Sequence, residues 1–104
     1  MKIVFLSNPA TAVLIMPERL DSRCGESLKL AVNILLAVGV ERITLAFSGL
    51  KGMTTPGYAA LIWAAERASK AMRPLGFDLM PEEQAMYFQL LGLGDRVELL
   101  NLPR

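Results

Sequence analysis

Two hydroxyl side chains stand before the most clearly marked helix start in this chain. Thr54 and Thr55 lie between the glycine-containing segment 48–52 and Pro56-Gly57, and an alanine-rich segment with helical character follows. A helix N-terminus presents backbone N–H groups and the positive end of the helix dipole, so it favours negative charge. Phosphate chemistry at a threonine hydroxyl is therefore the chemistry that this corner of the chain supports best.

Thr55 is also suited to a local structural role. Threonine is a favoured N-cap residue, and the first helical position tolerates the missing N–H of Pro56. We therefore expect Thr55 to cap the helix. A phosphate on Thr55 would add roughly −1.5 to −2 charges at the positive end of that helix.

Other reaction chemistry has few residues to draw on. The chain has no histidine and one cysteine, Cys24, which excludes Ser-His and Cys-His catalysis, histidine metal sites and an internal disulfide. The carboxylates of Asp21, Asp78 and Asp95 are not spaced as an acid–base pair. We therefore predict a protein that is not an enzyme and that uses neither a metal nor a cofactor.

Length and composition indicate one domain over residues 1–104. The 104 residues are 53% apolar and carry a formal net charge of +1, so the chain can bury its own core and has no electrostatic reason to bind nucleic acid. The apolar run at 2–7 is too short for a signal peptide or a membrane span. With one thiol, this predicts a cytoplasmic protein without direct membrane insertion.

The elements that would position the threonines alternate between strand and helix. Apolar runs predict strands at 2–7, 12–16, 41–47, 77–80 and 96–100, and helical periodicity predicts helices at about 22–38, about 56–72 and from Pro81 to Gly92. Asp21 or Ser22 is placed to cap the first helix, and Gly39 to end it. This alternation predicts an α/β fold with right-handed crossovers.

The second predicted helix carries a tryptophan on its polar side. At about 100° per residue, the stripe that faces the sheet consists of Leu61, Ala65, Ala68 and Met72. Trp63 then points away from the sheet, near Arg67 and Lys70, which is typical of an interface anchor. The alternative is a ring that lies on the aliphatic parts of Arg67 and Lys70. Tyr58 and Ile62 border Trp63 and extend the surface.

Four segments in order resemble the STAS domain, the fold of bacterial anti-sigma factor antagonists. The first two are Leu20-Asp21 before the first helix and Ile43 to Gly49, which resembles the family's buried strand and its Ser-Gly turn. The third, Met53 to Gly57, lies where the family has a hydrophobic residue followed by Asp-Ser-Ser-Gly. The fourth, Leu90 to Arg96, resembles the family's ending Leu-x-x-Gly-Leu-x-(Asp/Lys/Arg). The resemblance covers about residues 12–100. It implies a STAS-like single α/β domain, with a mixed four- to five-stranded sheet packed with three to four helices.

The resemblance implies a regulatory domain that binds other proteins. In the family, the first serine of this loop is phosphorylated by a partner kinase, and Thr55 holds that position here. Thr54 replaces the aspartate before it, and Pro56 replaces the second serine. The family docks through this loop and the following helix. The residues assigned to partner binding in segment 48–58 and the helix are Thr54, Thr55, Gly57, Tyr58, Ile62, Trp63 and Arg67.

Several partners fit this resemblance. They are an anti-sigma factor with kinase activity, the ATPase of an ABC-type lipid transport system, and other STAS proteins in a stress-signalling assembly; a homo-oligomer is also compatible. Loss of the aspartate favours the constitutive roles over a phosphorylation switch. A hypothesis of another class is a small ligand-binding domain, which requires a polar pocket at the strand ends near Asn8, Ser48 and Thr54.

Overall fold

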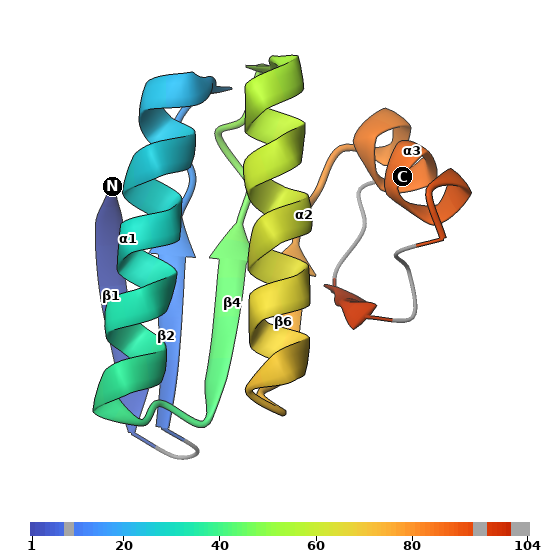
Figure 1. Cartoon of the computed structure of the whole chain (residues 1–104). Helices are drawn as coiled ribbons and strands as arrows, with labels where there is room; N and C mark the ends of the chain where they lie inside the picture. The colour runs from blue at the N-terminus through green and yellow to red at the C-terminus, as the bar shows by residue number, and fades with distance from the viewer. Residues whose placement is uncertain (8–9, 93–95, 101–104) are drawn as a thin grey trace.

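A five-stranded sheet and two long helices form the two layers of the structure (Figure 1). The computed structural model describes residues 1–7, 10–92 and 96–100. The strands are β1 (Lys2–Ser7), β2 (Ala10–Ile15), β3 (Arg19–Leu20), β4 (Arg42–Ala46), β5 (Gly52–Met53), β6 (Leu75–Asp78) and β7 (Glu98–Leu100). The helices are α1 (Ser22–Val38), α2 (Thr55–Lys70) and α3 (Glu82–Leu90).

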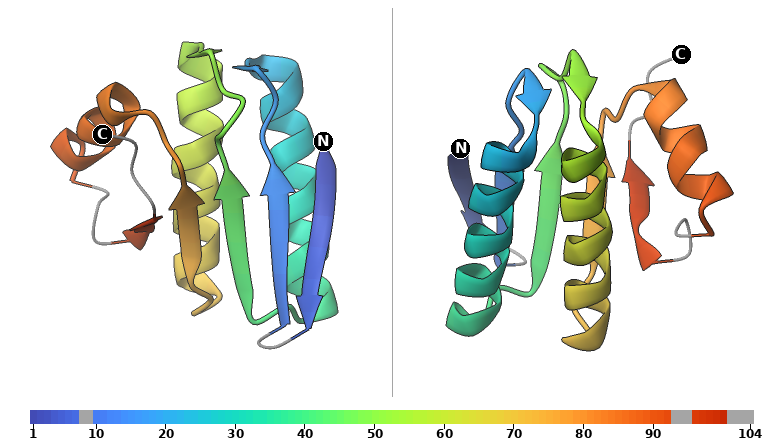
Figure 2. Two further views of the ribbon diagram at one scale, coloured as in Figure 1. Left: turned by 180° about the vertical axis from the view of Figure 1, so that it is seen from behind. Right: turned by 45° about the horizontal axis from the view of Figure 1, so that its top comes forward.

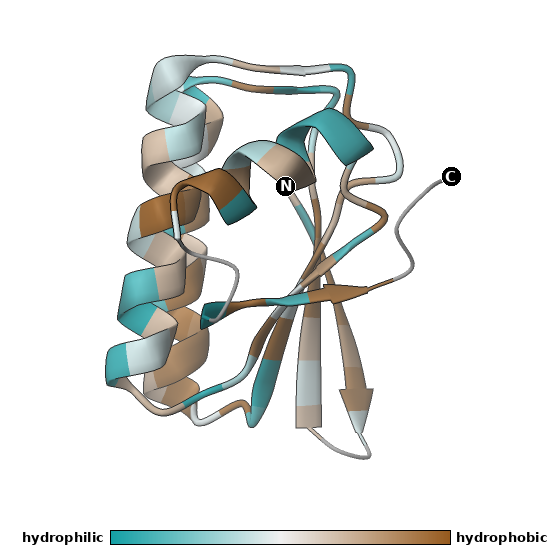
Figure 3. Cartoon of the chain, turned by 90° about the vertical axis from the view of Figure 1, so that its right-hand side faces the viewer, coloured by the Kyte–Doolittle hydropathy of each residue, from teal (hydrophilic) through white to brown (hydrophobic). Residues whose placement is uncertain are grey.

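The main sheet has the strand order β1-β2-β4-β6-β7. β1 runs antiparallel to β2, and the other neighbours are parallel. α1 and α2 lie side by side on one face, and α3 lies beyond α2 toward the β6 and β7 edge (Figures 1 and 2). Seen from the side of α3, the helix layer and the sheet layer separate clearly (Figure 3). The predicted mixed sheet of an α/β domain is confirmed.

Capping residues set the bounds of α1. The side chain of Asp21 accepts a hydrogen bond from the Cys24 N–H at 3.1 Å, so one of the unpaired donors of the first turn is satisfied. Gly39 has a φ of 87°, and its N–H donates to the Leu36 carbonyl at 3.2 Å. Glycine adopts this left-handed conformation without strain, which explains why the helix ends there.

The core lies between the sheet and the two long helices. Leu14, Leu45 and Phe77 of the central strands are fully buried. Phe77 meets Phe47 and Phe88 edge to face, with ring centroids 5.4 Å and 5.1 Å apart. Because Phe88 belongs to α3, this aromatic cluster attaches the short helix to the sheet.

Small side chains bring α1 and α2 close together. A Cβ at Gly25 would lie 3.0 Å from the Cβ of Ala60, so a larger residue at this crossing would push the helices slightly apart. Further along the pair, the Nε of Arg67 donates to the Asn33 side-chain oxygen at 3.2 Å. The two helices therefore contact each other near their beginnings and again near the last turn of α2.

Several predictions about elements are wrong in detail. The strand predicted at 77–80 is β6 at Leu75–Asp78, because pairing with β4 begins at Leu75 and Leu79 adopts a φ of 57°. The second helix ends at Lys70, because Met72 adopts a φ of 57°, which interrupts the helix; Met72 is 88% exposed and does not face the sheet. The two-residue strands β3 and β5 were not predicted. Gly92 has the positive φ of 75° expected after a helix end, and Leu93 lies outside the described residues.

Within the described residues, no helix combines the length and the apolar character that a membrane span requires.

Candidate functional site

The segment before α2 is attached to the segment before α1. β3 and β5 pair in parallel, with Leu20 opposite Met53. The N–H groups of Lys51 and Gly52 donate to the Glu18 carbonyl at 2.6 Å and 3.2 Å. These bonds hold residues 51–53 against residues 18–20, at the end of the sheet where both long helices begin (Figure 2). Residues 51–53 are therefore held in place by backbone hydrogen bonds within the chain.

Thr54, and not Thr55, is the N-cap of α2. The Thr54 Oγ1 accepts the Gly57 N–H at 3.3 Å and donates to the Leu20 carbonyl at 3.4 Å. The prediction that Thr55 caps the helix is wrong, because the helix begins one residue earlier and Pro56 takes its second position. Thr55 is the first residue of α2 and is exposed, and its hydroxyl makes no hydrogen bond among the described residues.

Gly57 is buried against the backbone of Leu20. A Cβ at Gly57 would lie 2.1 Å from the Leu20 carbonyl oxygen, far inside contact distance. The same carbonyl accepts the Thr54 N–H at 3.0 Å. Gly57 is therefore a structural residue of the site, and its side is closed to a partner.

The two neighbouring helix starts differ in charge. The hydrogen bond from the Cys24 backbone lowers the pKa of Asp21 below its ordinary value of 3.8, with Arg19 acting in the same direction. α1 therefore has an anion at its N-terminus. α2 has the neutral Thr54 as its cap and no acidic residue in its first turn. The positive end of α2 is thus the one that lacks a balancing negative side chain.

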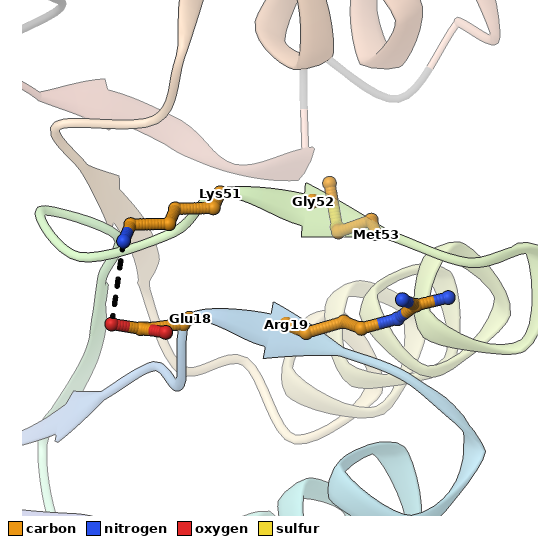
Figure 4. A pocket seen from close by; sticks show the side chains of 5 residues that line it. All are labelled: Glu18, Arg19, Lys51, Gly52 and Met53. Carbon is orange, nitrogen blue, oxygen red and sulfur yellow. Dashed lines mark ion pairs between the residues drawn. The ribbon is translucent and has the colours of Figure 1, made fainter.

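A groove of about 310 Å³ lies beside β3 and β5 (Figure 4). It is lined by Glu18, Arg19, Lys51, Gly52 and Met53. The Lys51 and Glu18 side chains face each other across one end at 3.6 Å, and both are mostly exposed.

The groove does not contain the residues that the ligand-binding hypothesis requires. Ser48 and Thr54 do not line it, and Asn8 lies outside the described residues. Ala10, at the start of β2, lies near the start of β4, since its carbonyl accepts the Glu41 N–H. Ser48 follows the opposite end of β4. The start of β2 and the loop before α2 therefore belong to opposite ends of the sheet.

A second groove, of about 270 Å³, lies between α2 and α3. Its lining residues are Tyr58, Glu83, Met86, Tyr87 and Leu90. The rings of Tyr58 and Tyr87 meet edge to face, with centroids 4.8 Å apart. Burial raises the pKa of Tyr58 above its ordinary value of 10.0, and the nearby Glu83 carboxylate raises it further.

The contribution of α3 was not predicted from the sequence. Met86, Tyr87 and Leu90 are 55%, 47% and 83% exposed, whereas Ala85 and Phe88 of the same helix are buried. α3 carries apolar residues on its exposed side as well as on its buried side, and this pattern in the sequence is the signal that could have revealed the surface.

The remaining predicted partner residues lie on the flanks of α2. Ile62 and Trp63 are half-buried and pack against the core. Arg67, one turn after Trp63, is held by Asn33 of α1. The prediction that Trp63 points away from the sheet is wrong in part, because the side chain is half-buried against the core.

Comparison with solved structures shows which known fold this chain resembles. No family model matches the chain, and no curated protein matches its sequence. The unphosphorylated anti-sigma factor antagonist SpoIIAA superposes with a TM-score of 0.79 at 14% identity, covering 98% of this chain and 88% of SpoIIAA. Phosphorylated SpoIIAA of Bacillus gives 0.77 at 16% identity, with coverages of 96% and 90%.

A third solved structure is the protein TM1081, with a TM-score of 0.78 at 13% identity. The match covers 96% of this chain and 79% of TM1081. At this identity the likeness concerns the fold, and it confirms the STAS-like architecture that the four sequence segments predicted.

Proposed function

We propose that this STAS-fold chain is a regulatory, non-enzymatic domain that binds a protein partner through segment 48–58, the exposed side of α2 and the outer face of α3. The exposed Thr55 at the first position of α2 carries the proposal. Thr54 supplies the cap, so the Thr55 hydroxyl is available for modification without loss of a folding contact.

Phosphorylation of Thr55 would alter docking by charge. It would place roughly −1.5 to −2 charges beside the helix end that has no acidic residue in its first turn. The fold would stay the same, because the modified oxygen makes no hydrogen bond among the described residues. The chain resembles the unphosphorylated and phosphorylated SpoIIAA structures about equally, with TM-scores of 0.79 and 0.77, which supports a modification that leaves the fold unchanged.

The groove between α2 and α3 supplies the apolar part of the docking surface. Met86, Tyr87 and Leu90 offer exposed apolar area beside Glu83. Aromatic and methionine side chains are enriched at protein interfaces. A partner with an apolar segment and a basic side chain fits this surface, because Glu83 would pair with the base at its rim.

Constitutive binding is the second candidate. Thr54 stands where the family has aspartate, and its hydroxyl is occupied by the cap. In that case the chain would be a permanent subunit, beside the ATPase of a lipid transporter or within an assembly of STAS proteins. Both candidates place the chain in the cytoplasm, and neither involves nucleic acid, a metal or a cofactor.

The experiment is affinity capture from a host lysate, with bound proteins identified by mass spectrometry. The baits are wild type, Thr55→Glu and Tyr87→Lys, with Met72→Glu as a matched control because Met72 is 88% exposed away from the site. We expect one protein to bind wild type and Met72→Glu equally and to be lost with Tyr87→Lys. Equal capture by Tyr87→Lys would contradict the proposed surface.

Thr55→Glu separates the two candidates. Loss of the partner with the Thr55→Glu bait, together with phosphothreonine at position 55 of the wild-type chain after incubation with the partner and ATP, would support the switch. Undiminished capture without phosphate incorporation would support constitutive binding.

A further inference from the structure

β1 forms one edge of the main sheet and is apolar on both faces. Ile3, Val4, Phe5 and Leu6 are 39%, 37%, 64% and 53% exposed. A strand that is apolar on both faces is typically covered on both faces. In this structure β1 has β2 as its neighbour in the sheet. It therefore has the composition of an interior strand and the position of an edge strand.

The edge of β1 lacks the usual protection against pairing. Soluble proteins shield edge strands by shortness, charge, proline or a bulge. The opposite edge, β7, has three residues and begins with Glu98. β1 has six residues, of which Lys2 alone is charged, and its register with β2 continues without a bulge from Lys2 to Ser7. Its outer backbone groups thus form an uninterrupted row.

α1 provides a second apolar surface beside the same edge. Leu30, Ile34 and Val38 follow at four-residue intervals and are 64%, 53% and 69% exposed. Asn33 marks the side that faces α2, since it accepts the hydrogen bond from Arg67. Ile34 and Val38 lie about 100° and 140° around α1 from Asn33, which places them on the flank away from α2. Figure 1 shows α1 in front of β1 and β2.

We propose that β1 pairs antiparallel with β1 of a second copy of this chain, giving a symmetric dimer whose sheet continues through both copies. A two-fold axis perpendicular to the sheet produces this pairing, and the interface is isologous. That axis keeps the helices of both copies on the same side. The α1 helices then lie next to each other across the dimer axis.

The side chains of β1 match this symmetry. Ile3 and Phe5 lie on the helix side, because they are opposite the buried Leu14 and Ala12 of β2. Across a two-fold axis at Val4, Ile3 of one copy meets Phe5 of the other, and the two Val4 residues meet on the rear face. Apolar side chains therefore meet apolar side chains on both faces of the joined sheet.

The spacing of the two α1 helices also fits. Neighbouring strands lie about 4.8 Å apart, so helices placed over β1 and β2 of each copy would run roughly 10 to 14 Å apart. Packed helices lie about 8 to 10 Å apart. Phe5, Ile34 and Val38 of both copies are available to fill the remaining space.

Charge does not oppose the pairing. With the axis at Val4, the two Lys2 residues would lie roughly 14 Å apart along the strands, which exceeds the Debye length of about 8 Å at physiological salt. A second copy fits better than an extended peptide, because a peptide would cover β1 and leave Ile34 and Val38 exposed. The surface lies at the opposite edge from α3, so it is independent of the proposed docking site.

The test is sedimentation equilibrium over micromolar to millimolar concentrations of the full chain. We expect wild type to reach twice the monomer mass. Phe5→Lys should raise the dimer dissociation constant by about 100-fold or more, because it buries two charges in the interface. Leu90→Lys, on α3 and 83% exposed, is the matched control and should change the dissociation constant by less than about 2-fold.

Ile34→Lys keeps the test decisive if Phe5→Lys does not fold. Ile34 is 53% exposed in the single chain, so lysine is tolerated in the monomer, and it should also weaken the dimer by at least about 10-fold. A wild-type chain that stays monomeric at millimolar concentration would overturn the proposal. A dimer that survives Ile34→Lys, or one that Leu90→Lys dissociates, would overturn it as well.

Discussion

The α-carbon of Gly57 lies so close to the Leu20 carbonyl that a methyl group would stand 2.1 Å from the oxygen. Gly57→Ala should therefore push α2 away from β3 and cost at least about 1 to 3 kcal/mol of unfolding free energy, since overpacked sites relax incompletely. Urea denaturation measures this change. Gly49→Ala is the control, because a Cβ there meets no described atom within 4 Å, and an equal loss in both variants would contradict the close contact.

The two threonines should differ in their contribution to stability. Thr54→Ala removes the oxygen that accepts the Gly57 N–H and should cost about 1 kcal/mol. Thr55→Ala should change stability by less than about 0.5 kcal/mol, because Thr55 is an exposed residue. Thermal and urea unfolding of both variants measure the difference, with Thr54→Ser as a variant that retains the cap. A larger loss of stability for Thr55→Ala than for Thr54→Ala would contradict the assignment of Thr54 as the N-cap.

Asp21 should make stability depend on pH in the acid range. The Cys24 N–H lowers the pKa of Asp21 in the folded chain below 3.8. The stabilising effect is therefore complete above the unfolded pKa and is lost as the pH falls through the folded pKa. Asp21→Asn keeps a capping oxygen but does not titrate, so the stability difference from wild type should shrink below about pH 4. Urea titrations between neutral and acid pH measure it, and a constant difference would contradict the prediction.

Tyr58 should have the opposite effect at alkaline pH. Its pKa is raised above 10.0 in the folded chain by burial and by Glu83. The stability linked to its neutral hydroxyl is present below pH 10 and is lost as the pH rises through the raised pKa. Tyr58→Phe should therefore unfold with a weaker pH dependence above pH 10. Denaturation at neutral pH is the internal control, and identical alkaline profiles would argue against the burial of the hydroxyl.

A helix whose two ends carry residues that favour a helix start and a helix end was predictable from the sequence. The range predicted for α1 matches the structure, because Asp21 and Gly39 are residues with strong local preferences for a helix start and a left-handed helix end. β3 and β5 were missed because two residues contain no periodicity. They exist through the pairing of Leu20 with Met53, which are far apart in the chain.

The misplaced details of the site have physical causes. Thr54 and Thr55 both precede Pro56, and local preference does not distinguish them; the Leu20 carbonyl, a tertiary contact, fixes the cap at Thr54. A helical wheel gives the orientation of Trp63 relative to the sheet but contains no information about α1, whose Asn33 accepts a hydrogen bond from Arg67 one turn after Trp63. The groove at Tyr58 and Tyr87 depends on how α3 is placed, and that placement follows from the aromatic cluster in the core.

The order of the strands in the main sheet is the order in which a ribosome releases them. β1, β2, β4, β6 and β7 follow one another across the sheet, each beside its predecessor. No strand of this sheet has to insert between two that are already paired. During synthesis, each completed strand can therefore be added to a growing edge, with its helix closing over the preceding strands before the next strand emerges. Stalled chains that end after α2 should already protect the backbone of β2 and β4.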